Sequence, residues 1–206
     1  MSDDYGFGED NNSESRFMYF AHQGEFENKF YRGKGDGKEA VNFKHIIFDH
    51  NSITTGWVWV RAGMEPVCVW NDEPKVWKAN PGQSQQEMDN YKKGFNINGY
   101  VQDVGLLTWS GSSFGSGKAF GKMMSDIEAQ RVANPGKYPV VQFDGAEVMR
   151  FSSGGSSSIP NLSVVSWAED KNYFTEAQPN GAYQEPAPVA QQQHEVIPPS
   201  EDNIPF

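Results

Sequence analysis

The chain has 206 residues and a net charge of -10, with 17 Lys and Arg against 27 Asp and Glu. This length favours one domain with appendages over two full domains. No apolar run approaches the roughly 20 residues of a membrane-spanning helix, and the start has neither the basic nor the apolar region of an export signal, so we expect a cytoplasmic protein with no membrane partner. A single cysteine, Cys68, excludes an internal disulfide and a Cys-cluster zinc site.

The excess negative charge lies at the two ends of the chain. Residues 1–15 and 176–206 each contain five Asp or Glu and no Lys or Arg, so 17 acids and all 17 basic residues lie between 16 and 175. Few large apolar groups occur in these ends. We therefore predict a disordered acidic arm at 1–15, a folded domain at 16–175 and a disordered acidic tail at 176–206. Because the body is neutral, a pI of 4.8 does not exclude nucleic-acid binding.

Runs of β-branched and aromatic residues, bounded by turn formers, predict strands along the body. Residues 41–48 and 53–61, separated by the turn formers of 49–52, are predicted to pair as a hairpin. The Ser- and Gly-rich stretch 152–158 is predicted to be a flexible hairpin loop. Further strand-like runs are 66–70, 95–109, 138–151 and 162–167.

One amphipathic helix is predicted before the last two strands. Apolar residues at 120, 123, 124 and 127 follow helical spacing, with Ser116 as a plausible N-cap and Asn134-Pro135-Gly136 as a stop. About five strands with a single helix in this place favour a mainly β fold of the OB type, which is a five-stranded Greek-key barrel. An open β-sandwich with an added helix is the alternative.

The predicted strand 53–61 alternates rings with aliphatic side chains. Successive side chains of a strand point to opposite faces, so Trp57, Trp59 and Arg61 should share one face and Val58 and Val60 the other. Flat rings beside a cation suit stacking on nucleic-acid bases, at about 1–3 kcal/mol per base, whereas aliphatic side chains suffice for a core. For each Trp taken alone, a core position is an equally good interpretation.

Rings and basic groups interleave again further along the chain. Rings that stack on bases and cations that neutralise phosphates are the two parts of a groove for single strands. Any one lysine, taken alone, is better explained as a solvated surface charge. The predicted nucleic-acid-binding residues are Lys34, Lys38, Lys44, Trp57, Trp59, Arg61, Trp70, Lys75, Trp77, Lys78, Tyr91, Lys92, Lys93 and Phe95.

Other chemical motifs fail on inspection. The glycine-rich stretch 111–118 has five residues instead of four before its Gly-Lys pair, and Ala119 stands where a phosphate-binding P-loop has Ser or Thr. His45 and Asp49 would share a strand face with His50 on the other, which argues against a metal site. No local Ser/His/Asp set indicates catalysis, and we predict no enzymatic activity, no cofactor and no metal.

The chain ends in Glu201-Asp202-Asn203-Ile204-Pro205-Phe206 after a Gln- and Pro-rich stretch. This ending strongly resembles the tail of the bacterial and phage single-stranded DNA-binding proteins, whose acidic tip closes with Ile-Pro-Phe. The resemblance implies an OB-fold body that coats single strands, and a tip that recruits replication, recombination and repair proteins. A terminal Phe with its free carboxylate fits an apolar pocket with a basic rim. The tip residues to which the resemblance assigns this role are Glu201, Asp202, Ile204, Pro205 and Phe206.

The chain also departs from that family. Its tip has two acids followed by Asn203 where the bacterial pattern usually has three. Residues 16–175 do not resemble the bacterial body, so a divergent phage-type member is the closer fit and the bacterial tetramer is not carried over. The oligomeric state stays open, a homo-oligomer included.

We therefore predict a non-enzymatic protein that coats single-stranded DNA without sequence preference, in a bacterial cell or in an infected host cell if it is phage-encoded. The alternative is a carbohydrate-binding β-sandwich, because exposed Trp and Tyr also stack on sugars. Such a module has no use for an acidic Ile-Pro-Phe tip or for lysines between its rings. An enzyme is the third hypothesis, and the lack of a catalytic motif argues against it. Preference for DNA over RNA stays open.

Overall fold

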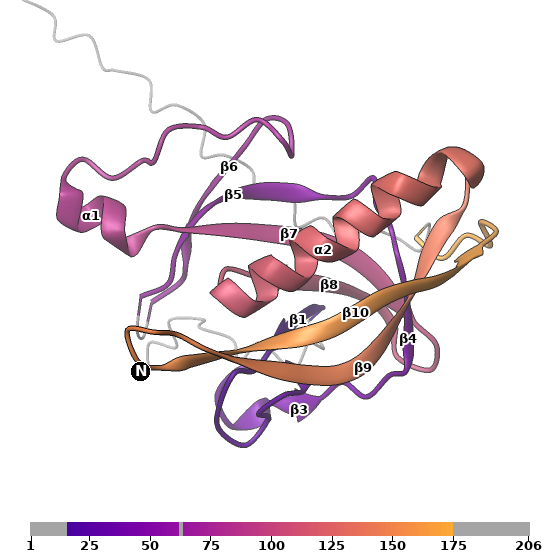
Figure 1. The fold of residues 1–206 in the computed structure, drawn as a ribbon, viewed down its shortest axis with the longest axis horizontal. Helices are drawn as coiled ribbons and strands as arrows, with labels where there is room; N and C mark the ends of the chain where they lie inside the picture. Colours follow the sequence, from indigo (N-terminus) through magenta and orange to yellow (C-terminus); the bar gives the residue numbers. More distant parts are fainter. Residues whose placement is uncertain (1–15, 62–63, 175–206) are drawn as a thin grey trace, which may run out of the picture. The chain divides into compact units, whose positions relative to one another are not determined.

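The computed structural model describes residues 16–61 and 64–174 (Figure 1). The predicted acidic arm and the predicted tail, with its tip, lie outside the described residues. The described strands are β1 (Phe17–Phe20), β2 (Phe30–Arg32), β3 (Glu39–Ala40), β4 (His45–Phe48), β5 (Thr54–Trp59), β6 (Val67–Trp70), β7 (Lys92–Val101), β8 (Gly105–Gly111), β9 (Tyr138–Arg150) and β10 (Ser156–Ala168). The helices are α1 (Gln85–Asn90) and α2 (Phe114–Gln130), with 3-10 turns at Gly35–Gly37 and Arg131–Ala133.

The protein is mainly β with one long helix, as predicted. Its strands form one sheet in the order β10-β9-β4-β7-β8-β1-β2-β3, with β5 on β7 and β6 on β5. The sheet is curled. Four strands, β4, β7, β8 and β1, lie between β9 and β2 in the sheet, yet the ring centroids of Phe143 in β9 and Phe30 in β2 are 5.1 Å apart. This arrangement is compatible with a β barrel.

The predicted hairpin between residues 41–48 and 53–61 is wrong. Strands β4 and β5 do not pair with each other, because both pair with the same edge of β7, β4 at Tyr100 and Gly99 and β5 from Asn96 onward. The chain between them bulges out of the sheet instead of reversing. Backbone groups of Asn98 close this bulge: its carbonyl accepts from the Asp49 amide at 2.9 Å and its amide donates to the Ser52 hydroxyl at 2.9 Å.

Two predicted segments have different boundaries in the structure. The run 95–109 is a hairpin of β7 and β8, whose turn places Asp103 and Gly105 at φ of 70° and 93°. The loop predicted at 152–158 is shorter, since Ser156 already starts β10. Gly154 and Gly155, at φ of 89° and 83°, make the tight turn between β9 and β10.

Helix α2 confirms the predicted amphipathic helix. Met123 and Ile127 are fully buried, and the chain leaves the helix before Asn134. The N-cap is Ser113 and not Ser116, because the Ser113 hydroxyl accepts a hydrogen bond from the Ser116 amide. Gly115 lets α2 approach β10 closely, since a Cβ atom there would collide with the carbonyl oxygen of Ser158.

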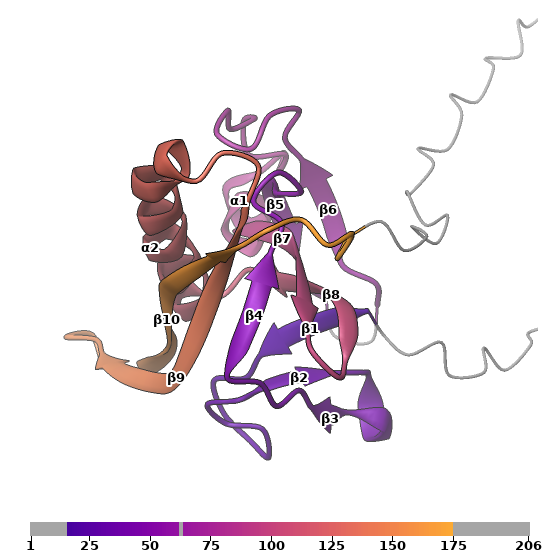
Figure 2. The same ribbon diagram turned by 90° about the vertical axis from the view of Figure 1, so that its right-hand side faces the viewer.

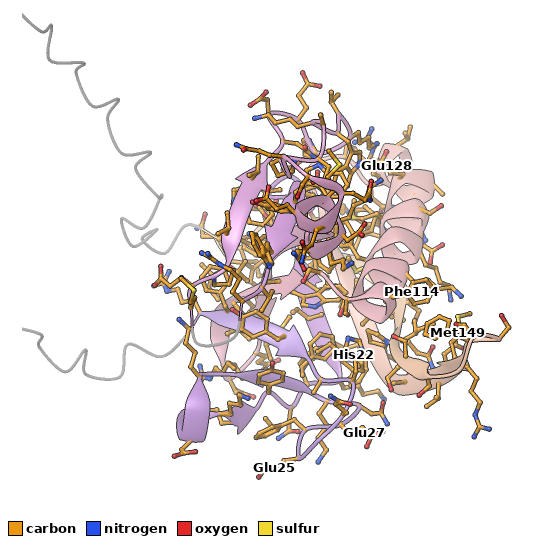
Figure 3. All side chains as sticks on the ribbon, turned by 90° about the vertical axis from the view of Figure 1, so that its left-hand side faces the viewer. His22, Glu25, Glu27, Phe114, Glu128 and Met149 are labelled. Atoms are coloured by element: carbon orange, nitrogen blue, oxygen red, sulfur yellow. The ribbon has the colours of Figure 1, made fainter. Side chains whose placement is uncertain are left out.

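His22 ties three distant segments together near the start of α2 (Figure 3). Its Nδ1 donates to the carbonyl oxygen of Ser158 in β10 at 2.9 Å, and in the neutral ring Nε2 accepts from the hydroxyl of Ser113. The segment after β1 is thereby fixed both to the helix start and to β10. These bonds lie on the side of the curled sheet where β10 pairs with no described strand other than β9.

One core lies between the curled sheet and α2. Figure 2 shows α2 on one side of the body and β6 with β1–β3 on the other. None of the described helices is long and apolar enough to cross a membrane. The largest fully buried side chains of the core are Trp109, Phe30, Phe48, Met18, Ile46, Ile97, Leu107, Met123, Ile127 and Val141.

Phe95 is a core residue, and we expect Phe95→Ala to lower the free energy of unfolding by about 3–5 kcal/mol. Its ring is 4% exposed, lies 4.0 Å from the Phe120 ring in a stacked pair and 4.8 Å from Trp109. Chemical denaturation followed by circular dichroism measures the loss. Phe114→Ala is the matched control, since that ring is 54% exposed, and an equal loss in both variants would contradict the placement of Phe95.

Candidate functional site

An arm continues the sheet beyond the core. It consists of residues 56–61 and 64–93: the end of β5, β6, the connection that contains α1, and the first two residues of β7. Gly56 allows β5 and β6 to approach, because a Cβ atom there would collide with the backbone of Val69 and Trp70. In register, Trp57 stands opposite Lys93 on β7 and opposite Val69 on β6.

The predicted alternation is found at Trp57, Val58 and Trp59, where β5 ends, whereas Val60, predicted to share the face of Val58, is 65% exposed. Val58 is 9% exposed, whereas Trp57 and Trp59 are half-buried on the other face. Neither indole belongs to the core. The alternative interpretation, that these indoles are core residues, is therefore wrong for both rings.

Trp57, Trp77 and Lys93 form one compact group. The two indole centroids lie 5.8 Å apart at an interplanar angle of 74°, and the Lys93 ammonium lies 4.5 Å from the Trp77 centroid and 6.0 Å from that of Trp57. Trp77 is 38% exposed. Among the described residues Lys93 forms no ion pair, so its positive charge sits over two rings without a carboxylate to neutralise it.

Trp59, Tyr91 and Arg61 form a second group beside the first. The Trp59 and Tyr91 centroids are 5.5 Å apart, and the Arg61 guanidinium carbon lies 5.3 Å from the Trp59 ring. Arg61 Nε is buried and has no hydrogen-bond partner in the part of the chain that the structure describes. We call the two groups together, Trp57, Trp59, Arg61, Trp77, Tyr91 and Lys93, the arm cluster.

A hydrogen-bond network sets the position of Trp77, and sequence reasoning missed it. The Asn71 side chain donates to the Thr55 hydroxyl at 2.8 Å and accepts from the Lys78 amide at 3.0 Å. The Thr55 hydroxyl, in a residue 6% exposed, donates to the Pro74 carbonyl at 2.6 Å. Trp57 Nε1 donates to the Lys78 carbonyl at 2.9 Å. The only local signal for this network is an Asn next to a Pro-containing loop.

Two predicted ring residues lie outside the arm cluster. Phe95 cannot meet a ligand because its ring is buried in the core, which corrects its assignment to the binding face. Trp70 pairs in register with Gly56, so it lies on the face of the arm opposite Trp57. The spacing of rings and lysines in the sequence does not indicate which face each ring occupies.

The predicted lysines other than Lys93 are dispersed. Lys75 pairs with Glu128 of α2 at 3.1 Å and Lys78 with Asp72 at 2.9 Å, so both charges are partly neutralised. Lys92 alternates with Lys93 on the opposite face of β7. Lys34 and Lys38 flank the 3-10 turn at Gly35–Gly37, and exposed Lys44 precedes β4.

Other candidate chemistry is not assembled in the described residues. His45 bonds to Gln142 at 3.2 Å, and the described part of the chain holds no group of three or more His, Cys, Asp or Glu that could ligate a metal. A shallow groove of about 500 Å³ lies on the face of β4, β7 and β9, and no predicted binding residue lines it. Its lining includes His45, Ile47, Tyr100, Gln102, Val140 and Tyr173.

A scan against protein-family models and searches of curated proteins and of solved structures found no match to this chain.

We expect Asn71→Ala to free the loop that carries Trp77. The substitution removes one bond to Thr55 and one to the Lys78 amide, which should lower stability by about 1–3 kcal/mol and increase quenching of tryptophan fluorescence by acrylamide. Asn71→Asp is the control, because it keeps the acceptor for Lys78. If Asn71→Ala leaves quenching and stability unchanged, the network does not position the ring.

Proposed function

We propose that this chain is a non-enzymatic protein that binds single-stranded DNA without sequence preference. The observation that carries the proposal is the arm cluster, in which four partly exposed rings are combined with Lys93 and Arg61 on adjoining surface. Rings offer a stacking surface to any base, while cations next to them meet the phosphates that link successive bases. Such a surface needs no groups that read base edges, and it therefore tolerates any sequence.

The order of the strands supports an OB fold as the finer description. Taking β4 with β5 as the first strand, β7 and β8 as the second and third, and β9 and β10 as the last two, α2 lies between the third and the fourth. In OB folds the face of strands 2 and 3 and the loops 1-2 and 4-5 bind oligonucleotides and oligosaccharides. On this assignment the arm is the loop 1-2 of the fold, which is where a strand-binding cluster is expected.

The tip supplies the second half of the proposal. Glu201 and Asp202 followed by Ile204-Pro205-Phe206 resemble the tips with which single-stranded DNA-binding proteins recruit replication, recombination and repair proteins. A partner pocket would take the Phe206 ring and pair its own basic groups with the carboxylates of Glu201 and Asp202. We propose the same recruiting role for this tip, in the cytoplasm of a bacterial or an infected cell.

Trp59→Ala should weaken binding to oligo-dT by about 1–3 kcal/mol while the fold survives, because one stacking ring is lost. Trp59 is preferred to Trp57 for this test, because the Trp57 indole also donates a hydrogen bond to the Lys78 carbonyl and so helps to position the 71–78 loop. The measurement is a fluorescence titration of the full chain with oligo-dT at two salt concentrations, with thermal melting in parallel. Binding should weaken with added salt.

Two parallel titrations separate the alternatives. Oligo-rU measures preference for DNA over RNA, and a series of oligosaccharides tests a carbohydrate-binding module, whose exposed rings would also respond. Quenching by sugars with none by oligo-dT would refute the proposal. DNA affinity that does not change with salt would contradict the proposed contacts of Lys93 and Arg61 with phosphates.

Deleting Phe206 should abolish capture of partner proteins and leave DNA affinity nearly unchanged. The terminal ring is the anchor of the tip, whereas the five acids between 176 and 206 all remain. Pull-downs from a bacterial lysate with the full-length and the shortened chain, beside DNA titrations of both, measure the two effects. Equal partner recovery by both chains would remove the recruiting role from the tip.

A further inference from the structure

Three short strands at the N-terminal side of the body extend the sheet beyond β8. β1 pairs in parallel with β8, β2 pairs with β1, and β3 pairs with β2. An OB fold of five strands does not require them. Met18 and Phe20 of β1 point into the core, so Phe17 and Tyr19 occupy the outer face.

The outer face of these strands carries a row of rings. Tyr19 and Tyr31 are partners in register with centroids 5.7 Å apart, and Phe26 stacks on Tyr31 at 5.6 Å and 25°. The Lys38 ammonium lies 5.6 Å from the Tyr31 centroid. The group therefore repeats the composition of the arm cluster. We call Phe26, Tyr19, Tyr31 and Lys38 the outer cluster.

Two features indicate that the outer cluster is a surface for a ligand. None of its rings belongs to the core, and neither tyrosine hydroxyl has a hydrogen-bond partner among the described residues. Burial, with smaller contributions from Tyr31 and Cys68, raises the pKa of Tyr19 above its usual value. Burial also raises the pKa of Tyr31, so both hydroxyls are neutral donors at physiological pH and do not repel phosphates.

Strand β6 forms the edge between the two clusters. Among the described strands it pairs only with β5, and its residues Val67 and Val69 stand beside Trp59 and Trp57 on the face of the arm cluster. Cys68 and Trp70 occupy the opposite face. The Cys68 thiol is one of the smaller contributions that raise the pKa of Tyr19 in the outer cluster. Figure 2 shows β6 and β1–β3 on the same side, away from α2.

We propose that the outer cluster is a second stacking surface for the same nucleic-acid strand, which passes over the β6 edge from the arm cluster and contacts Tyr19 and Tyr31 only when it is long enough. This inference rests on the proposed single-strand binding and extends it from the arm to a second surface on β1 and β2. Trp70, excluded from the arm cluster by its face, lies on the route between the two surfaces.

The test compares short and long strands on the full chain. OB folds cover from about 4 to about 16 nucleotides, so oligo-dT of about 6 and about 25 nucleotides separates one cluster from two. Tyr31→Leu should leave the affinity for the short strand unchanged and lower the affinity for the long one about tenfold, on the scale of one lost base stack. Tyr31→Phe keeps the ring and should restore long-strand binding. Trp59→Ala should lower the affinity at both lengths.

Each other outcome counts against the inference. Wild-type affinity of Tyr31→Leu for the long strand, or an equal loss at both lengths, overturns it. Thermal melting of Tyr31→Leu and Tyr31→Phe checks the fold, and sedimentation checks whether the outer cluster joins two copies of the chain. A dimer that Tyr31→Leu dissociates with no change in long-strand affinity makes the cluster a self-association surface and overturns the inference. If the unaltered chain binds neither strand, the proposed function fails, and the inference fails with it.

Discussion

The two edges of β7 determine where β4, β5 and β8 lie, and with them the core and the arm. One edge pairs with β8 along seven residues, and the other pairs with β4 near its end and with β5 near its start. The same strand therefore contributes Ile97 to the core and Lys93 to the arm cluster. Phe95 lies between them on the same face of β7 and is the last buried residue of the core before the exposed Lys93. The register of β7 thus fixes the spacing between core and site.

The bulge between β4 and β5 allows β7 to serve both parts. If β4 and β5 formed one continuous strand along this edge of β7, the alternation of buried side chains in β4 would continue unchanged into the arm. The Ser52 hydroxyl accepts from the Asn98 amide, and the Asp49 amide donates to the Asn98 carbonyl. Five residues between β4 and β5 can therefore leave the sheet while both backbone groups of Asn98 keep a hydrogen-bond partner. A two-stranded ribbon is marginally stable by itself, so the pairing of β5 with β7 and the Asn71 network are what keep the rings of the arm in fixed positions. Fixed rings lose little entropy on meeting a base, which favours binding.

Local patterns predicted local structure well. Helix α2, strand β9 and the alternation of Trp57, Val58 and Trp59 were all predictable, since each depends on spacing within one segment. The false hairpin at 41–61 shows the limit: turn formers mark an interruption, but whether the chain reverses depends on β7, some forty residues later. The prediction of Phe95 as a binding residue is wrong because the spacing of rings and lysines does not reveal which face meets the core. The strands β1–β3 have two to four residues each, and they join the sheet through the pairing of β1 with β8, so their own sequence gives little strand signal.

The distribution of charge decides which force the proposed binding depends on. In the arm, Lys75 and Lys78 pair with carboxylates and Lys92 lies on the face opposite Lys93. Among the described residues of the arm, Lys93 and Arg61 are the cations that lie over rings. For single strands, the slope of log affinity against log salt is about -0.7 per phosphate neutralised. With so few uncompensated cations, counterion release supplies less of the affinity than in a strongly basic groove, and ring stacking has to supply more. This explains how a body with no net positive charge can still be suited to a polyanion: the rings provide attraction, and the few cations need only orient the backbone between them.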